Sequence, residues 1–486
     1  MATIGERVRS RVLKWLFQGD VMTLDAEERK AQGIIALARK YYNGDQVVYM
    51  TTRQKAWLDL HPGKVRFVVN VCATVIDAVV ERLKVTGFDV SDDIETGEED
   101  IDQTLWSWWT ANRMDAVQTE AHRQAVRDGE SFIITAWNAK QARPDFVLHQ
   151  RFIDKTLGGD GFGCWIEYEN NDPFGNPARA FKQWTEDSDA GARVRRTIYY
   201  PDRIEKYALD GDWQQVQDEG DTGWPIPWVD GQGQPIGIPV AHLRNPSLRS
   251  ELHDIIPLQD ALNKAWLDIM AASDSTAFRM LVVLGFVPTT DGKEPADDGS
   301  NLLQIAPGQM LSTRKKPGEV SVDSIEPASL DPLLQVEERI IYRVAQISDT
   351  PLNRFQFSRQ VAAEGTLQQM EGPLIAKIQE RQVLMGNAWE DMMHQAIRQA
   401  AMFGGYQFGD VPINTVWSPA AVRDEKKEIE VATAKKLLGV PTEQIWSELG
   451  YDAQQIAQMQ ESPEVQARTA NQNMAVALAT QGAFGQ

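Results

Sequence analysis

The amino-acid sequence predicts an α+β chain built from several subdomains. Two long helical segments with apolar stripes flank a short β-rich insert, and a third long helical segment contains a Gly-Pro pair. The first half of the chain alternates strand-like runs with Gly, Asp and Pro turns. With 486 residues and 42% hydrophobic content, the chain can bury a large core that is divided among several packed units.

The first half begins with helical segments and continues with runs rich in aromatic and β-branched residues. Five of these runs predict successive strands: residues 144–152, 163–170, 178–186, 192–200 and 203–211. The Pro- and Gly-rich residues 223–245 predict a loop or linker. Upstream, Trp106 and Trp109 fall on one helical face beside Leu105, which favours core packing over a contact between subunits.

The first long helix is predicted from Pro257 to about Met280, because proline suits an early helical position. Its apolar residues follow helical spacing: Leu258, Leu262, Trp266, Ile269 and Met270. At the rise of an α-helix this segment would span roughly 35 Å.

The second long helix is predicted to start with Asp331 as its N-cap and Pro332 in its first turn, and to stop before Pro351. One apolar stripe contains Leu333, Val336, Ile340, Ile341, Val344 and Ile347. Between the two helices, residues 281–288, 301–313 and 319–325 predict short strands separated by turns. The insert is therefore a small β module carried on two helices.

The third helical segment follows a polar loop that carries Arg354 and Arg359. It runs from Glu364 to about Phe403 and contains Gly372 and Pro373. Proline removes one backbone hydrogen bond and clashes with the preceding turn, so this pair predicts a kink.

Six strings in this order resemble the portal proteins of tailed double-stranded DNA bacteriophages, of the siphophage type. Each string alone is weakly specific, but their order is specific, and together they cover most of the chain. They are residues 65–83 after YYNGDQ (41–46), then 108–137, 256–268, 331–351, 364–374 and 416–451. One departure is Glu364-Gly365, where the family often has a Ser-Gly pair at the start of its tunnel helix.

The resemblance implies a portal-like subunit, and its parts map onto this sequence as follows. The wing would be residues 1–250, the first stem helix 251–282, the clip 283–326, the second stem helix 327–350, the tunnel loop and kinked helix 351–403, the helical crown 404–460 and a flexible tail 461–486.

The same resemblance implies a dodecameric ring at one vertex of the capsid, a conduit for DNA packaging and ejection. Its implied partners are the large terminase subunit, a head-tail adaptor, the major capsid and scaffolding proteins, and double-stranded DNA passing through the channel. The protein would belong to the virion, would be assembled in the host cytoplasm, and would be neither an enzyme nor a cofactor-binding protein.

Within that expectation, the tunnel loop supplies four candidates for DNA contact: Arg354, Gln356, Arg359 and Gln360. Pairing of the two arginines with acids of a neighbouring subunit is the competing interpretation. The clip candidates for partner binding are Arg314, Lys315 and Lys316, for which a solvated turn is the alternative. Gly372 and Pro373 are the candidates for a moving kink.

The net charge of −20 argues against a protein that holds nucleic acid by broad phosphate neutralisation. An acidic or neutral channel wall would let DNA slide without ion pairing, while the competing explanation is that the charge keeps a large protein dispersed. The most apolar segment, residues 65–80, carries Arg66, Asn70 and Asp77, so no membrane span is expected. Basic residues interrupt any signal-peptide core in residues 1–20.

Sequence motifs for catalysis or metal binding are missing. There is no phosphate-binding GxxxxGK[ST] loop, no HExxH and no GxSxG, and the glycine-rich residues 158–163 predict a turn. The six histidines lack ligand spacing, and Cys72 and Cys164 give no disulfide framework. The acidic residues 89–100 predict a solvated loop before a helix rather than a calcium site.

Two alternatives from other classes remain at this point. One is a soluble hydrolytic enzyme with an acidic, tryptophan-rich cleft, which would turn over a substrate as a monomer or small oligomer. The other is a different structural head protein, such as an adaptor or minor capsid component, although such chains are usually shorter and lack paired stem helices.

Overall fold

A computed structural model gives the fold over most of the chain. It describes residues 32–52, 54–55, 68–90, 101–152, 163–172, 174–188, 191–277, 281–284, 321–324, 329–355, 364–406, 408, 411–421, 425–449, 456, 459 and 462.

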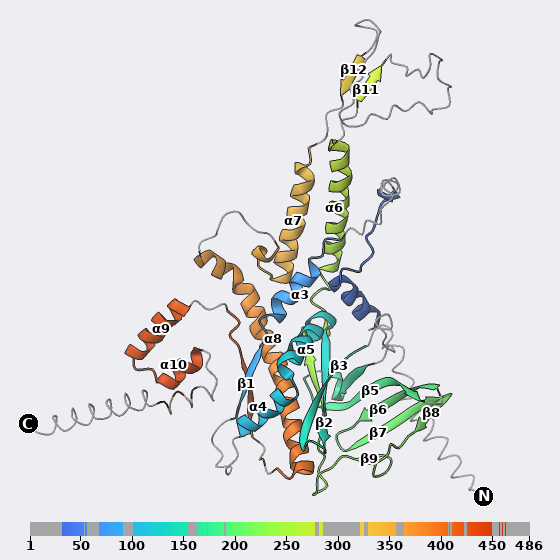
Figure 1. Ribbon diagram of the computed structural model, residues 1–486, viewed down its shortest axis with the longest axis vertical. Helices are drawn as coiled ribbons and strands as arrows, with labels where there is room; N and C mark the ends of the chain where they lie inside the picture. The colour runs from blue at the N-terminus through green and yellow to red at the C-terminus, as the bar shows by residue number, and fades with distance from the viewer. Residues whose placement is uncertain are drawn as a thin grey trace, which may run out of the picture.

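Two helices rise side by side from the body of the molecule and carry a small β pair at their far end (Figure 1). They are α6 (Ile256–Ala277) and α7 (Asp331–Ser348). The β pair joins β11 (Leu281–Leu284) to β12 (Ser321–Ser324) in antiparallel register. Both predicted helices and the outer two predicted strands are confirmed, whereas residues 301–313 lie outside the described residues.

The start of α7 differs from the prediction by one residue. Asp331 is the first helical residue rather than the N-cap, and its N–H donates to the Ser329 hydroxyl at 3.2 Å. The predicted apolar stripe is wider than the surface that α6 covers. Ile341 and Val344 are buried, but Val336 and Ile347 are 46% and 49% exposed.

The strand-rich half of the body holds two sheets. One has the order β10-β2-β3, and the other has the order β4-β5-β6-β7-β8 with β9 beside β7. The strands are β2 (Glu130–Asn138), β3 (Arg143–Gln150), β4 (Cys164–Tyr168), β5 (Pro177–Ser188), β6 (Gly191–Tyr199), β7 (Arg203–Asp210), β8 (Asp212–Gln215), β9 (Ile226–Pro227) and β10 (Val240–Arg244). All five predicted strands are therefore confirmed.

The interpretation of residues 223–245 as a loop or linker is wrong at Ile226–Pro227, which forms β9, and at its C-terminal end. Val240–Arg244 forms β10, which pairs with β2 from Val240↔Ile134 to Arg244↔Glu130. Val240, Ala241, His242 and Leu243 are all buried. The loop prediction rested on the Gly and Pro residues upstream, and the short strand that follows them is buried on both faces.

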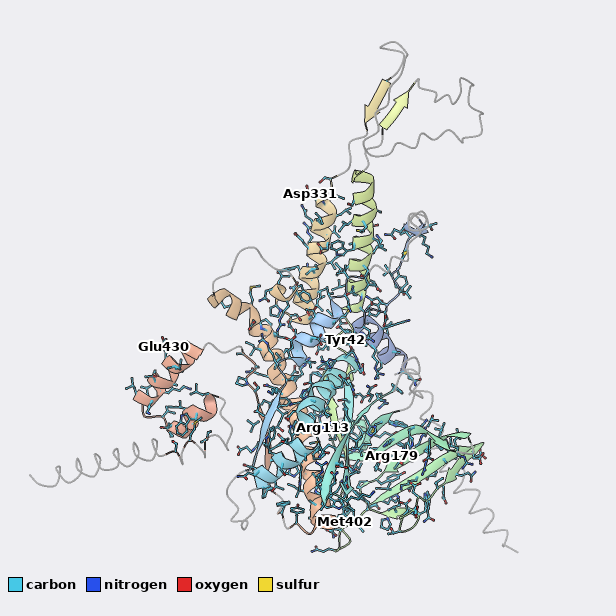
Figure 2. All side chains as sticks on the ribbon, viewed as in Figure 1. Tyr42, Arg113, Arg179, Asp331, Met402 and Glu430 are labelled. Carbon is cyan, nitrogen blue, oxygen red and sulfur yellow. The ribbon has the colours of Figure 1, made fainter. Side chains whose placement is uncertain are left out.

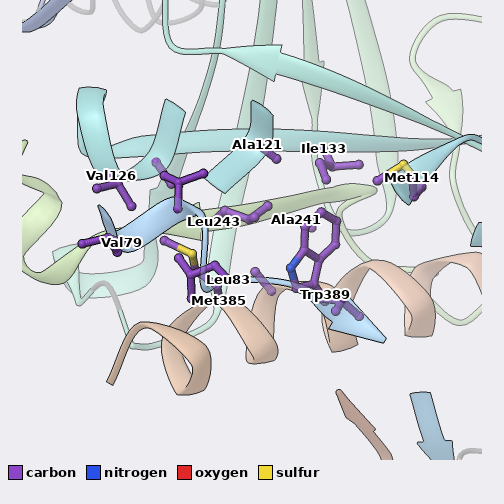
Figure 3. Close-up of a cluster of buried hydrophobic side chains, with 14 of the residues drawn as sticks. Val79, Leu83, Met114, Ala121, Val126, Ile133, Ala241, Leu243, Met385 and Trp389 are labelled. Atoms are coloured by element: carbon purple, nitrogen blue, oxygen red, sulfur yellow. The ribbon is translucent and has the colours of Figure 1, made fainter. Parts of the chain in front are cut away.

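Strand β2 separates two hydrophobic clusters, because its alternate side chains point to opposite faces. Ile133 belongs to the main core, and Phe132 and Ile134 belong to a second cluster with Trp165 and Phe181 of the six-stranded sheet. Figure 3 shows the main core, where Met385 and Trp389 of α8 meet side chains such as Leu243. The apolar run in β2 is continuous because both of its faces are covered.

Helices surround the main core. They are residues 32–42, α3 (Cys72–Val80), α4 (Ile101–Ala111), α5 (Met114–Asp128) and α8 (Glu364–Gln399), which continues as a π-helical turn (Ala400–Gly404). Short 3-10 turns occupy Glu169–Asn171, Pro246–Leu248 and Leu352–Arg354. Helix α5 ends at Gly129, where φ is 101° and an added Cβ would lie 2.6 Å from the Leu248 carbonyl oxygen.

The tryptophans of α4 pack in the core, as predicted. Trp106 and Trp109 stack with ring centroids 5.9 Å apart, and Trp109 is fully buried. Trp108, on another face of α4, meets Tyr406 and Phe408 edge-on. Cys72 and Cys164 are buried free thiols.

Residues 404–460 were expected to be a helical crown, but they include a strand. Residues Ile413–Trp417 form β13, which pairs with β1 (Val85–Val90) from Val85↔Trp417 to Val90↔Ile413. This part of the chain therefore belongs to the body. Beyond it, α9 (Glu425–Leu437) and α10 (Thr442–Glu448) lie beside the body in Figure 1.

Candidate functional site: the base of the paired helices

The body meets the paired helices where α7 ends, α8 crosses and α3 ends. Figure 2 shows Asp331 at the far end of α7, so α7 runs toward the body, and Tyr42 lies near its base. We call the charged cluster at this place the junction. Its members are Glu81, Arg82, Glu251, Arg354, Glu371, Lys377 and Arg381.

The end of α7 is fixed by its sequence. Asp349 adopts the left-handed conformation with φ 54°, and its N–H donates to the Ala345 carbonyl oxygen. Pro351 follows and cannot continue the helix, so the chain turns into the short 3-10 turn that ends at Arg354. This geometry places Arg354 beside the end of α3.

Arg354 forms an ion pair with Glu81 of the same chain, with Nη1 2.9 Å from Oε2. The two side chains are 35% and 54% exposed, so water screens the pair. Within the single chain, Arg354 is therefore paired rather than free.

Arg82, the next residue, reaches two other elements. Its Nη2 lies 3.1 Å from Glu371 Oε1 on α8, and its Nη1 donates to the Ala420 carbonyl oxygen at 3.1 Å. The Arg82 side chain is only 9% exposed. The end of α3 therefore holds the first part of α8 and the segment that follows β13.

Glu251 lies in the chain between β10 and the start of α6. Its two oxygens accept from Lys377 Nζ at 2.7 Å and from Arg381 Nη2 at 2.5 Å. All three side chains are less than a tenth exposed. Lys377 and Arg381 are four residues apart on α8, so both project from the same helical face.

The charges of the junction determine the protonation of Glu251. Burial alone would raise the pKa of this carboxyl, but Lys377 and Arg381 lower it below its ordinary value through their charges and hydrogen bonds. Glu251 is therefore ionised at neutral pH.

Lys377 also binds the end of α7. Its Nζ donates to the Ser348 carbonyl oxygen at 2.8 Å. The last carbonyl groups of a helix have no partner within the helix and carry partial negative charge, which a lysine neutralises. A single lysine thus connects α8, the last turn of α7 and Glu251.

The N-terminal part of the chain is attached to α6 by side-chain amides. Gln259 Oε1 accepts from the Val71 N–H at 2.9 Å while its Nε2 donates to the Val69 carbonyl oxygen, and Asn263 Oδ1 accepts from the Val69 N–H at 3.0 Å. Asn70, which the sequence analysis noted with Asp77, donates to the Tyr42 carbonyl oxygen at 2.8 Å. These bonds hold α3 against the base of α6.

Few of the predicted site residues can be placed. Arg354 lies in the junction, and Gly372 and Pro373 lie in α8, exposed. The others lie outside the described residues: Gln356, Arg359, Gln360, Arg314, Lys315 and Lys316. Helix α8 continues through Gly372 and Pro373. Pro373 has no N–H to donate to the carbonyl oxygen of Gln369, and Gln369 is exposed.

Sequence reasoning missed most of the junction. Glu81 and Arg82 lie in residues 65–83, which indicated the portal family but no contact. Glu251 lies between two predicted elements. The spacing of Lys377 and Arg381 on a predicted helix was the one local signal that they share a face. Their partner is remote in sequence, so no local pattern identified it.

Elsewhere in the described residues, the titratable side chains make structural contacts. In the described part of the chain, no group of three or more His, Cys, Asp or Glu side chains is arranged to hold a metal ion. His242 Nε2 lies 3.0 Å from Glu130 Oε2 and its Nδ1 lies 2.9 Å from the Tyr168 hydroxyl, which places these three groups in one largely buried network. Among the described helices, none is long and apolar enough to cross a membrane.

Comparison with known proteins gives consistent matches over most of the chain. The sequence profile of the family described as phage portal protein, SPP1 Gp6-like, matches residues 24–469. The portal protein of Mycobacterium phage D29 is 26% identical over 421 residues, which cover 81% of this chain and 78% of that protein. The portal protein of Mycobacterium phage L5 is 25% identical over 418 residues, with the same coverage of each chain.

Proposed function

The chain belongs to the SPP1 Gp6-like family of phage portal proteins, and from this premise we propose that it forms the ring at the portal vertex of a phage capsid. The ring is the conduit through which DNA enters during packaging and leaves during ejection. The observation that carries the proposal is the family match over residues 24–469. The two long helices that lie side by side, run in opposite directions and bear a β pair at their far end agree with it.

The parts of the subunit follow from this assignment. Helices α6 and α7 are the stem, and the β11–β12 pair belongs to the clip. The two sheets with α3, α4 and α5 form the wing, to which β13 contributes, and α9 and α10 form the crown. The clip is the docking platform for the large terminase subunit and later for a head-tail adaptor, with Arg314, Lys315 and Lys316 as its basic candidates.

DNA passes through the ring without being held tightly. Gln356, Arg359 and Gln360 in the tunnel loop contact the phosphate backbone transiently. Arg354 takes part by exchanging Glu81 for phosphate, which costs little because an exposed ion pair contributes little stability. The overall charge of −20 supports a weakly interacting channel.

The partners and location follow from the same assignment. The ring, with about a dozen subunits, contacts the major capsid and scaffolding proteins and is a component of the virion. Portal proteins are structural, non-enzymatic proteins, and no observation favours the hydrolytic alternative. Acids of the junction such as Glu251 are used in ion pairs with Lys377 and Arg381.

Genetic complementation tests the proposal. A phage that lacks this gene should assemble capsids without packaged DNA, and supply of the chain in trans should restore DNA-filled heads. DNA content per particle is the measurement, and a variant with Asp254→Asn in an exposed ion pair is a suitable positive control. DNA-filled heads formed without the chain would contradict the proposal.

A further inference from the structure

We propose that Glu251 is a buried ion lock that fixes the middle of α8 to the base of the paired helices. Lys377 bonds to the end of α7, and Glu251 holds both Lys377 and Arg381, so α7 and α8 move as one unit while these bonds persist. The inference concerns the regulation of the proposed conduit and rests on the proposed function for its consequence, but not for its geometry.

The first step is that one carboxylate serves two cations away from water. Lys377 Nζ and Arg381 Nη2 lie 2.7 and 2.5 Å from different oxygens of Glu251. Asn245 Nδ2 adds a third donor at 3.1 Å to one of these oxygens. With side-chain exposures of 9%, 9% and 8% for Glu251, Lys377 and Arg381, solvent cannot replace these bonds without opening the junction.

The second step is that the lock joins three parts of the molecule. The Glu251 N–H donates to the Val126 carbonyl oxygen at 3.1 Å, which attaches the lock to α5 in the body. Lys377 donates to the Ser348 carbonyl oxygen at the end of α7. Arg381 and Lys377 both belong to α8. A displacement of α7 along its axis therefore pulls on the same lysine that holds α8.

Among the described residues, Glu251 is the one anion that Lys377 and Arg381 share. Removal of Glu251 leaves two buried cations facing each other's positive charge, and loss of one member of a buried pair is far more costly than loss of an exposed pair. Arg381 Nη1 keeps a hydrogen bond to the neighbouring Glu380, but the Glu380 side chain is 59% exposed. The cluster therefore depends on Glu251, and loss of this carboxylate should loosen α7 and α8 locally.

On the proposed function, the lock gives α8 a defined response to events at the far end of the stem. A partner that shifts α7 would shift α8 with it, because the Ser348 carbonyl and Glu251 share Lys377. The coupling is physical and needs no movement of the two wing sheets.

Amide hydrogen exchange on the purified full-length chain tests the lock in three variants. Glu251→Gln removes the charge with little change of shape. Lys377→Met removes the bond to Ser348 and leaves the Glu251–Arg381 pair intact, so it carries the test if the first variant does not fold. Asp254→Asn is the matched control, since Asp254 lies three residues away in an exposed pair with Arg249.

We expect Glu251→Gln to speed exchange roughly 100-fold at residues 345–350 and 374–385 while strands β5 to β7 stay unchanged. Lys377→Met should speed exchange at the same residues by a smaller factor, and Asp254→Asn should not alter it. Unchanged exchange in both junction variants, or equal acceleration across the whole chain, would overturn the proposal. The variants are compared with the wild type in the same oligomeric state and the comparison does not require rings, so a failure to form rings would count against the proposed function alone.

Discussion

His122 lies in the main core and uses both ring nitrogens. Trp389 Nε1 donates to His122 Nε2 at 3.1 Å, so the ring proton is on Nδ1, which donates to the Leu83 carbonyl oxygen at 3.1 Å. Burial lowers the pKa of His122 from 6.5 to about 3, although the hydrogen bond to Leu83 opposes this shift. The histidine is therefore a neutral connector between α5, the turn after α3 and α8.

This histidine predicts a pH dependence of stability. Below pH 6.5 the unfolded chain binds a proton that folded His122 does not bind until about pH 3, so its contribution is complete above pH 6.5 and decreases as the pH falls toward 3. At about pH 5 the loss is about 2 kcal/mol. Urea unfolding should show that His122→Gln weakens the dependence by this amount, whereas His253→Gln, at an exposed residue, should not. Equal pH dependence in wild type and His122→Gln would contradict this account.

Two of the three arginines of the junction, Arg82 and Arg354, make a second prediction at this scale. Arg82→Met removes a side chain that is 9% exposed from the partly buried Glu371 and from the carbonyl oxygen of buried Ala420, and it should lower the free energy of unfolding by about 1–3 kcal/mol. Arg354→Met breaks an exposed pair and should cost less than about 1 kcal/mol. Urea denaturation of both variants measures the difference, and an equal cost would show that exposure does not govern these pairs.

Single residues also mark where sequence reasoning stops. The stacking of Trp106 on Trp109 was predictable from helical spacing, because both ends of the contact lie on α4. The pairs Arg354–Glu81 and Lys377–Glu251 join residues far apart in the chain. Nothing local selects one acid from the many on a strongly acidic chain, so these pairs required the fold.

At the scale of elements, α6 and α7 were predictable, whereas several short strands, β10 and β13 among them, were not. Both helices combine an early proline with an apolar stripe, and α7 also has a stop signal in Pro351, so independent signals agree. Strand β10 follows a stretch rich in Gly and Pro, and β13 is a five-residue run among helical signals whose partner β1 lies more than three hundred residues earlier. Short strands are determined by their partners rather than by their own sequence.

Helix α8 makes a prediction for the Gly372-Pro373 pair. Nothing lies within 4 Å of a Cβ added at Gly372, so alanine fits there, and alanine at 373 restores an N–H donor. Alanine favours an α-helix over glycine by about 1 kcal/mol and over proline by about 3 kcal/mol. We expect Gly372→Ala/Pro373→Ala to stiffen and straighten α8 and to reduce the DNA packaged per particle.

The control for this prediction is another exposed α8 position. Val383 is 65% exposed, and Val383→Ala should leave packaging unchanged. Full-length genomes packaged by the double variant would mean that α8 does not need to bend at this pair.

At the scale of the whole molecule, the paired helices, the β pair at their end and the strands of the larger sheet were expected from local sequence patterns, and the order of six sequence strings pointed to one family. The outline of the fold was therefore predictable, because several weak local signals follow one another along the chain in an order that is specific to the family. The junction that holds these parts together was not, since it consists of long-range contacts between elements. How subunits meet one another is likewise decided by surfaces that a single sequence records only faintly.

The central claim is that this chain forms a ring with a channel. Negative-stain electron microscopy of the purified protein, with mass photometry of the same sample, tests it most directly. The account predicts particles with a central hole and a mass near that of a dozen subunits of 54.5 kDa. A monodisperse monomer that stays monomeric in the presence of the scaffolding protein would contradict it.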